Sequence, residues 1–192
     1  MKTQKLPVWK RELPNIITWG RIAAIPAVMY FLHISNHLDS QTDLWADFWA
    51  TTIFAIASVS DFFDGYFARI FKVETRMGMF LDPVADKLLV TAALIMLIPL
   101  GRISPILVVL LLSRDLMING LRAVAAGEKM TIKASWTAKW KTGAQMTGIP
   151  FLMKRTLFDF PILTTGQILL WIALVLSLLS AFDYLKAFIN RK

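Results

Sequence analysis

The chain has 192 residues, of which 56% are hydrophobic and 18% are charged, and its 21 Lys and Arg against 13 Asp and Glu give a net charge of +8. Soluble domains usually have about 45–50% apolar and about 25% charged residues. The composition therefore predicts a single integral membrane domain and excludes disordered and collagen-like chains. The chain has seven Trp, a residue that is common at the membrane interface. With no cysteine, disulfide scaffolds, thiolate nucleophiles and cysteine-based metal sites are also excluded.

Residues 1–14 are basic and polar, and no signal-peptide cleavage site follows them. We expect this segment to lie on the membrane surface. A helix needs about 20 apolar residues to cross a bilayer, and six later stretches approach that length. In chain order, the expected helices are Ile16–His33, Leu44–Phe67, Gly78–Leu100, Ile103–Val124, Ala138–Phe158 and Ile162–Ile189. The fifth is the weakest, because its start is polar and it ends in Lys154 and Arg155.

The distribution of Lys and Arg predicts the orientation of these helices. If the N-terminus is cytoplasmic, the only basic residues in the outer connections are Arg102, Lys154 and Arg155. The first outer connection, Asn36–Asp47, contains three Asp and no Lys or Arg. The positive-inside rule then favours six crossings with both termini in the cytoplasm. The sequence predicts an all-α, multi-pass six-helix bundle of the cell membrane, formed by residues 1–192 as one domain.

Four aspartates interrupt the apolar pattern of the second and third expected helices. Asp61 and Asp64 are three residues apart, and Asp82 and Asp86 are four apart, so each pair shares a helix face. Both pairs fall near the expected cytoplasmic ends of their helices, and we expect them to meet there. Clustered carboxylates require a cation, and oxygen ligands that also face phosphate favour Mg²⁺ or Mn²⁺. Four carboxylates can hold two such ions.

The spacing around these aspartates resembles the signature of the CDP-alcohol phosphotransferase family, D-x-x-D-G-x-x-A-R, eight residues, then G-x-x-x-D-x-x-x-D. The residues at the fixed positions are Asp61, Asp64, Gly65, Ala68, Arg69, Gly78, Asp82 and Asp86. The resemblance implies six transmembrane helices, a homodimer, two divalent ions, and transfer of a CDP-activated phosphoalcohol to an acceptor hydroxyl with release of CMP.

The resemblance also implies roles for these residues. It makes Asp61, Asp64 and Asp82 metal ligands, and Asp86 a metal ligand or the general base. It implies that the CDP-lipid is held by the remaining signature residues together with two of the aspartates. This nucleotide set is Asp61, Gly65, Ala68, Arg69, Gly78 and Asp82.

Further segments resemble the members of this family whose acceptor is glycerol 3-phosphate. They are Leu13–Thr18 with Arg21 and Pro26, Arg114–Asp115 with Leu121 and Arg122, and Ala134–Ser135 with Lys139, Lys141, Thr142 and Gln145. A small dianion needs several cations, so the candidates for its site are Arg114, Arg122, Lys139 and Lys141. Lys139 and Lys141 cannot share a helix face, and we expect only one to point inward.

The expected reaction takes place at the cytoplasmic face of the membrane. Asp86 accepts the proton of the 1-hydroxyl of glycerol 3-phosphate, this oxygen attacks the β-phosphorus of CDP-diacylglycerol, and CMP leaves. No nucleic-acid partner is expected.

Several alternatives remain open from the sequence. The aspartates could form buried ion pairs, Arg114 and Asp115 could be a structural pair, and the other candidate cations could be positive-inside anchors. The chain could use another acceptor, as phosphatidylinositol-phosphate, phosphatidylserine or cardiolipin-type synthases do, or be an inactive homologue. From a different class, the carboxylates could line a divalent-cation transporter, although Arg69 on the same helix argues against a cation pathway.

Overall fold

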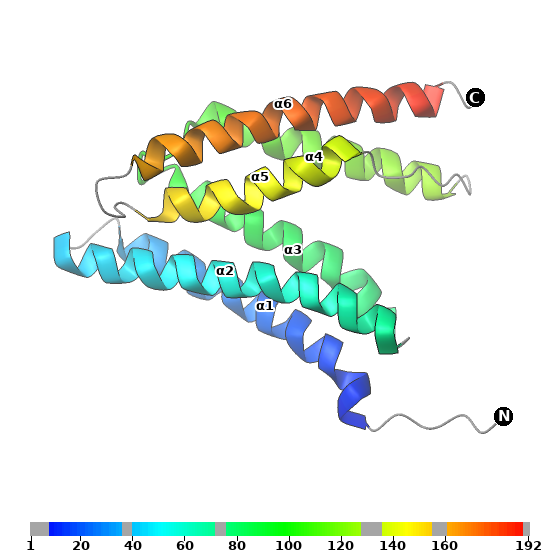
Figure 1. Cartoon of the computed structure of the whole chain (residues 1–192), viewed down its shortest axis with the longest axis horizontal. Coiled ribbons are helices and arrows are strands. Elements are labelled where there is room, and N and C mark those ends of the chain that lie inside the picture. The colour runs from blue at the N-terminus through cyan, green and yellow to red at the C-terminus, as the bar shows by residue number, and fades with distance from the viewer. Residues whose placement is uncertain (1–7, 36–39, 72–75, 128–135, 155–160, 190–192) are drawn as a thin grey trace. The chain divides into compact units, whose positions relative to one another are not determined.

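The computed structural model describes residues 8–35, 40–71, 76–127, 136–154 and 161–189, and it leaves out the side chains of residues 8–16, 40–42, 61–71, 76–80, 82–83, 126 and 187–189. The described ranges contain six α-helices and no strand. They are α1 (Val8–Ile34), α2 (Ser40–Phe71), α3 (Arg76–Leu97), α4 (Pro105–Gly127), α5 (Trp136–Met153) and α6 (Ile162–Ile189) (Figure 1). The predicted all-α class and the number of helices are confirmed.

The chain divides into two compact units, Met1–Met96 and Leu97–Lys192. In the N-terminal unit, α1 packs along α2 (Figure 1). The two helices bury Leu32 and Phe54 completely. The hydroxyl of Ser35, just after α1, donates a hydrogen bond of 2.6 Å to the buried carboxylate of Asp47 on α2. This polar contact joins the end of α1 to the second helix.

In the C-terminal unit, α6 packs along α5 and also contacts α4. Two glycines let α5 and α6 approach closely. A Cβ atom added to Gly166 would lie 2.9 Å from Cγ of Leu152 and 3.0 Å from the carbonyl oxygen of Gly148. Small residues at such crossings allow backbone contact between apolar helices. The pairing of Gly166 with Leu152 and of Leu170 with Gly148 shows that the two helices are antiparallel.

The turn between α3 and α4 explains why α3 ends at Leu97, three residues before the predicted Leu100. Pro99 disfavours the helical conformation of the residue before it. Gly101 then adopts a left-handed backbone with φ of 66°, which glycine accepts without steric cost. α4 begins at Pro105, a favourable first helical residue because it has no N–H to leave unbonded.

The C-terminus of α5 is held by Arg102, a residue of that turn. Its guanidinium donates hydrogen bonds to the carbonyl oxygens of Leu152, at 3.2 Å, and of Met153. Gln167 on α6 donates to the carbonyl oxygen of Arg102 at 3.2 Å. The buried Arg102 thus satisfies the last carbonyl groups of α5. α5 therefore ends at Met153 and not at the predicted Phe158.

The other boundaries differ more modestly from the predictions. α1 begins at Val8, so half of the expected surface segment is helical and continuous with the first apolar stretch. α2 extends beyond the predicted range at both ends, and α6 has the predicted bounds. Among the described residues, two stretches are long and apolar enough to cross a membrane, Ile17–Ile34 and Ile162–Lys186. Six crossings and their orientation stay predictions.

Candidate functional site

The aspartate signature spans the C-terminal part of one helix and the N-terminal part of the next helix in the chain. Asp61 and Asp64 lie in the last turns of α2, which ends at Phe71, and Asp82 and Asp86 lie in the first turns of α3, which begins at Arg76. The prediction that each carboxylate pair belongs to one helix is therefore confirmed. Three- and four-residue spacings within a helix place each pair on one face.

The side chains of most signature residues lie outside the described part of the structure. They are Asp61, Asp64, Gly65, Ala68, Arg69, Gly78 and Asp82. Asp86 is described and is half-buried on α3. The meeting of the two pairs and their roles as ligands stay predictions. Within the described residues, no group of three His, Cys, Asp or Glu is placed to hold a metal ion. The donor chemistry of the four carboxylates fits Mg²⁺ or Mn²⁺, which prefer oxygen ligands.

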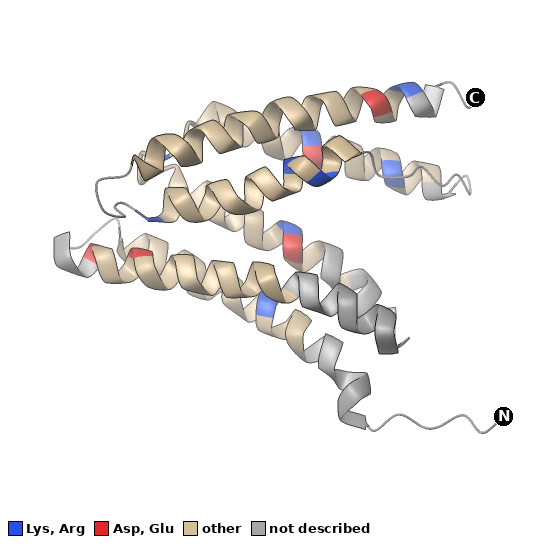
Figure 2. Ribbon diagram, in the orientation of Figure 1, with Lys and Arg blue, Asp and Glu red and all other residues tan. Residues whose placement is uncertain are grey.

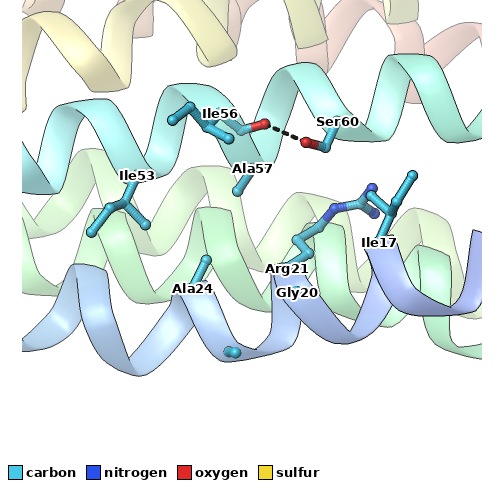
Figure 3. Close-up of a pocket in the computed structure, with 9 residues that line it drawn as sticks. Ile17, Gly20, Arg21, Ala24, Ile53, Ile56, Ala57 and Ser60 are labelled. Atoms are coloured by element: carbon cyan, nitrogen blue, oxygen red, sulfur yellow. Dashed lines mark hydrogen bonds between the residues drawn. The ribbon is translucent and has the colours of Figure 1, made fainter. Parts of the chain in front are cut away.

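A cavity of about 430 Å³ lies between α1 and α2. Its lining on α2 ends at the residue that precedes the signature in the sequence. Figure 3 shows Arg21 from α1 and Ser60 from α2 among its lining residues, with Gly20 and Ala24 beside Arg21. Arg21 is only 2% exposed, and the Ser60 hydroxyl donates to the carbonyl oxygen of Ile56 at 2.7 Å. Ser60 immediately precedes Asp61, so the cavity reaches the level on α2 at which the signature starts.

Two of the four candidate acceptor cations belong to a buried ion cluster in the C-terminal unit. The Lys141 ammonium on α5 donates to both carboxylate oxygens of Asp115 on α4, at 2.7 and 2.6 Å. Arg114 donates from Nη1 to Asp115 at 3.1 Å and from Nε to the carbonyl oxygen of Ser177 on α6 at 2.8 Å. Arg114 and Lys141 are 8% and 7% exposed. Figure 2 shows basic and acidic residues of α4 and α5 lying together.

The other two candidate cations are exposed and lie over aromatic rings. The Arg122 guanidinium is 5.6 Å from the centre of the Tyr184 ring, and the Lys139 ammonium is 5.5 Å from the centre of the Trp136 ring. Such cation–π contacts hold a charge in place while leaving it accessible to solvent. The prediction that only one of Lys139 and Lys141 points inward is confirmed, because Lys141 is buried and Lys139 is exposed.

Three further residues lie in the acceptor region. Asp115 and Gln145 belong to segments that resemble the family, but the sequence does not assign them to the acceptor site. The contact of Asp115 with Lys141 depends on how α4 and α5 are placed. Gln145 follows Lys141 by one helical turn, and its buried Nε2 has no hydrogen-bond partner among the described residues. Ser177 bonds Arg114 through its carbonyl oxygen, and no motif on α6 indicates it.

Known proteins similar to this chain match it over nearly its whole length. The family model described as CDP-alcohol phosphatidyltransferase matches residues 11–179. A protein of Rickettsia bellii is 37% identical over 178 residues, which cover 92% of this chain and 94% of the relative. Relatives from Haemophilus influenzae and Escherichia coli are 38% and 33% identical, again over 92% of this chain, and cover 93% and 94% of their own lengths. All three are named CDP-diacylglycerol–glycerol-3-phosphate 3-phosphatidyltransferase. The chain belongs to the CDP-alcohol phosphatidyltransferase family.

Proposed function

We propose that this protein transfers the phosphatidyl group of CDP-diacylglycerol to glycerol 3-phosphate, giving phosphatidylglycerophosphate and CMP in anionic phospholipid synthesis. The observation that carries the proposal is the complete aspartate signature on α2 and α3. Relatives from three bacterial species are named for this reaction, and each match covers 92% of this chain. The protein must therefore bind three groups: the acyl chains and the nucleotide of CDP-diacylglycerol, and the phosphate of the acceptor.

In this proposal the four aspartates hold Mg²⁺ or Mn²⁺, with room for two ions, because their oxygen donors suit hard divalent cations. The bound ions would supply stabilisation of negative charge at the phosphates. Asp86 is the residue that takes the proton from the 1-hydroxyl of glycerol 3-phosphate, so that this oxygen can attack the β-phosphorus. Its half-buried position on the first turns of α3 supports that role.

The nucleotide end of CDP-diacylglycerol is assigned to the small and basic signature residues. Gly65, Ala68 and Gly78 leave space for a flat nucleotide beside the helices, and Arg69 supplies a positive charge for phosphate. These residues lie on the same two helices as the aspartates. Asp61 and Asp82 complete the set that binds the CDP-lipid.

The acceptor phosphate is assigned to Arg114, Arg122, Lys139 and Lys141. Arg122 and Lys139 are exposed and can meet a soluble dianion first. Arg114 and Lys141 are buried and are fixed by defined contacts, so they suit a final binding position. Directional donors from Arg are well matched to phosphate oxygens.

The proposed setting is the cell membrane, with six crossings, both termini and the active site on the cytoplasmic side, and a homodimeric assembly. Large apolar side chains that remain exposed support a lipid-facing surface. Examples are Trp45 on α2, Leu116 on α4 and Phe182 on α6, which are 66%, 73% and 69% exposed. In this setting the acyl chains of CDP-diacylglycerol stay in the lipid, and the phosphates of both substrates bind at the membrane surface.

An acceptor screen tests this function. Purified protein with CDP-diacylglycerol and Mg²⁺ or Mn²⁺ should release CMP when glycerol 3-phosphate is added, and not with serine, inositol phosphate or phosphatidylglycerol. CMP release with one of those acceptors instead would assign the chain to another branch of the family. Divalent-metal flux into proteoliposomes without nucleotide-dependent turnover would favour the transporter alternative.

The Asp86→Asn variant tests the assignment of the base within that reaction. Asparagine keeps the size of the side chain but cannot accept the proton. We expect turnover to fall by at least about 100-fold, the usual scale of general-base catalysis, while radiolabelled CDP-diacylglycerol still binds. Turnover equal to that of the unaltered protein would remove the general-base assignment and leave the acceptor assignment standing.

A further inference from the structure

We infer that Asp115 is a positioning residue, which holds Lys141 and Arg114 in the arrangement that binds the phosphate of the acceptor. The inference rests on the proposed function and adds to it a residue that makes the acceptor site rigid. Asp115 is an acid, so it cannot itself bind a phosphate dianion. Its contacts instead lead to the two buried cations.

Asp115 and its neighbour Arg114 link three helices. Lys141 on α5 bonds both carboxylate oxygens, and Arg114, the neighbour of Asp115 on α4, bonds one of them. Arg114 in turn bonds the backbone of Ser177 on α6. A bidentate contact fixes the direction of the Lys141 side chain, which otherwise has four rotatable bonds. The carboxylate therefore determines where the ammonium group lies relative to the guanidinium.

The packing of α5 on α6 places Lys141 and Ser177 at the same height along the two helices. Gly148 on α5 lies against Leu170 on α6, and the two helices are antiparallel. Lys141 is about two turns before Gly148, and Ser177 is about two turns after Leu170. Lys141 and Ser177 are therefore at the same height along the helix pair. Arg114 and Asp115, which are neighbours on α4, can therefore contact α6 and α5 at the same height.

The charges and exposure of the cluster favour an anion ligand. Two cations and one carboxylate leave a net charge of +1, in a region where the side chains of Arg114 and Lys141 are each 9% exposed and that of Asp115 is 25% exposed. Of the five N–H donors of Arg114, the described residues engage two. Without Asp115, the two buried cations would repel each other and Lys141 would lose its orientation. The acceptor phosphate would then meet a disordered site.

Steady-state kinetics of the full-length Asp115→Asn variant test the inference. We expect KM for glycerol 3-phosphate to rise about tenfold or more, the effect of losing about 1.4 kcal/mol of binding. KM for CDP-diacylglycerol and kcat should change less than about threefold on the same scale. Asp115→Glu, which keeps the charge, should recover part of the affinity. Asp183→Asn is the matched control, because Asp183 is an exposed acid on α6, and should behave as the unaltered protein.

A double-substitution cycle keeps the test decisive if Asp115→Asn alone is unstable. If Asp115 acts through Lys141 and Arg114, then Lys141→Met raises KM for glycerol 3-phosphate, and adding Asp115→Asn raises it further by a smaller factor, because only the contact with Arg114 is left to lose. A second increase as large as the first would overturn the inference, as would an unchanged or lowered KM in folded Asp115→Asn protein. Failure of the proposed function is distinguishable, because the unaltered protein would then show no CMP release that depends on glycerol 3-phosphate.

Discussion

Arg102 shows how a single buried cation can stabilise the end of a helix. It is 4% exposed and donates to two carbonyl groups in the last turn of α5. Replacing it with Met leaves these acceptors buried without a charged donor. We expect Arg102→Met to lower the free energy of unfolding by about 2 kcal/mol, within the range for hydrogen bonds to charged groups. Chemical denaturation in detergent, followed by circular dichroism, measures the change.

Two further variants separate the hydrogen bonds of Arg102 from its charge. Arg102→Lys keeps the charge but lacks the planar fork, so it should recover only part of the stability. Lys186→Met removes an exposed cation near the end of α6 and should cost at most about 1 kcal/mol, the scale of a charge at a helix terminus. Equal losses in Arg102→Met and Lys186→Met would contradict the role of Arg102 as a cap of α5.

At the scale of helices, the close contact of α5 and α6 depends on glycine. A Cβ atom on Gly166 would meet the backbone oxygen of Gly148 at 3.0 Å, and this oxygen cannot move without shifting α5. We expect Gly166→Ala to lower the free energy of unfolding by about 1–3 kcal/mol, the usual cost of overpacking. Thermal denaturation in detergent measures it.

Gly143→Ala is the matched control on α5. Gly143 is exposed, and a Cβ atom there would meet nothing within 4 Å. Alanine favours the helix over glycine by about 0.8–1.0 kcal/mol, so this variant should be as stable as the unaltered protein or more so. If Gly166→Ala were equally harmless, the close α5–α6 contact would be refuted.

Features that depend on one helix could be predicted from the sequence, whereas features that depend on how helices pair could not. Local spacing predicts that Lys139 and Lys141 diverge and that the aspartate pairs lie on helices, because both follow from helix periodicity. Spacing could not predict the end of α5, since Arg102 caps it from about 50 residues away along the chain. For the same reason the hydrogen bonds that Lys141 donates to Asp115 could not be predicted, because they depend on how α4 and α5 are placed.

At the scale of the whole molecule, the exposed surface of several helices is strongly apolar. Val109 on α4, Val175 on α6 and Ile56 on α2 are 60%, 55% and 62% exposed, although their helices also contribute to the buried core. Many exposed apolar side chains are costly in water and are compatible with contact with lipid. α4 carries Arg114, Asp115 and Arg122 within its length, which explains why composition alone does not single it out as a membrane span.

Single-cysteine labelling tests whether the chain crosses the membrane six times. The chain has no cysteine, so each introduced thiol would be the only reactive one. Ser104, before α4, and Gly127, at its end, are both exposed. If α4 crosses as the positive-inside rule predicts, a membrane-impermeant maleimide should label Ser104→Cys in intact cells, but Gly127→Cys only after permeabilisation. Lys186→Cys, near the end of α6, should match Gly127→Cys. If only the two most apolar helices cross, Ser104→Cys and Gly127→Cys would label from the same side.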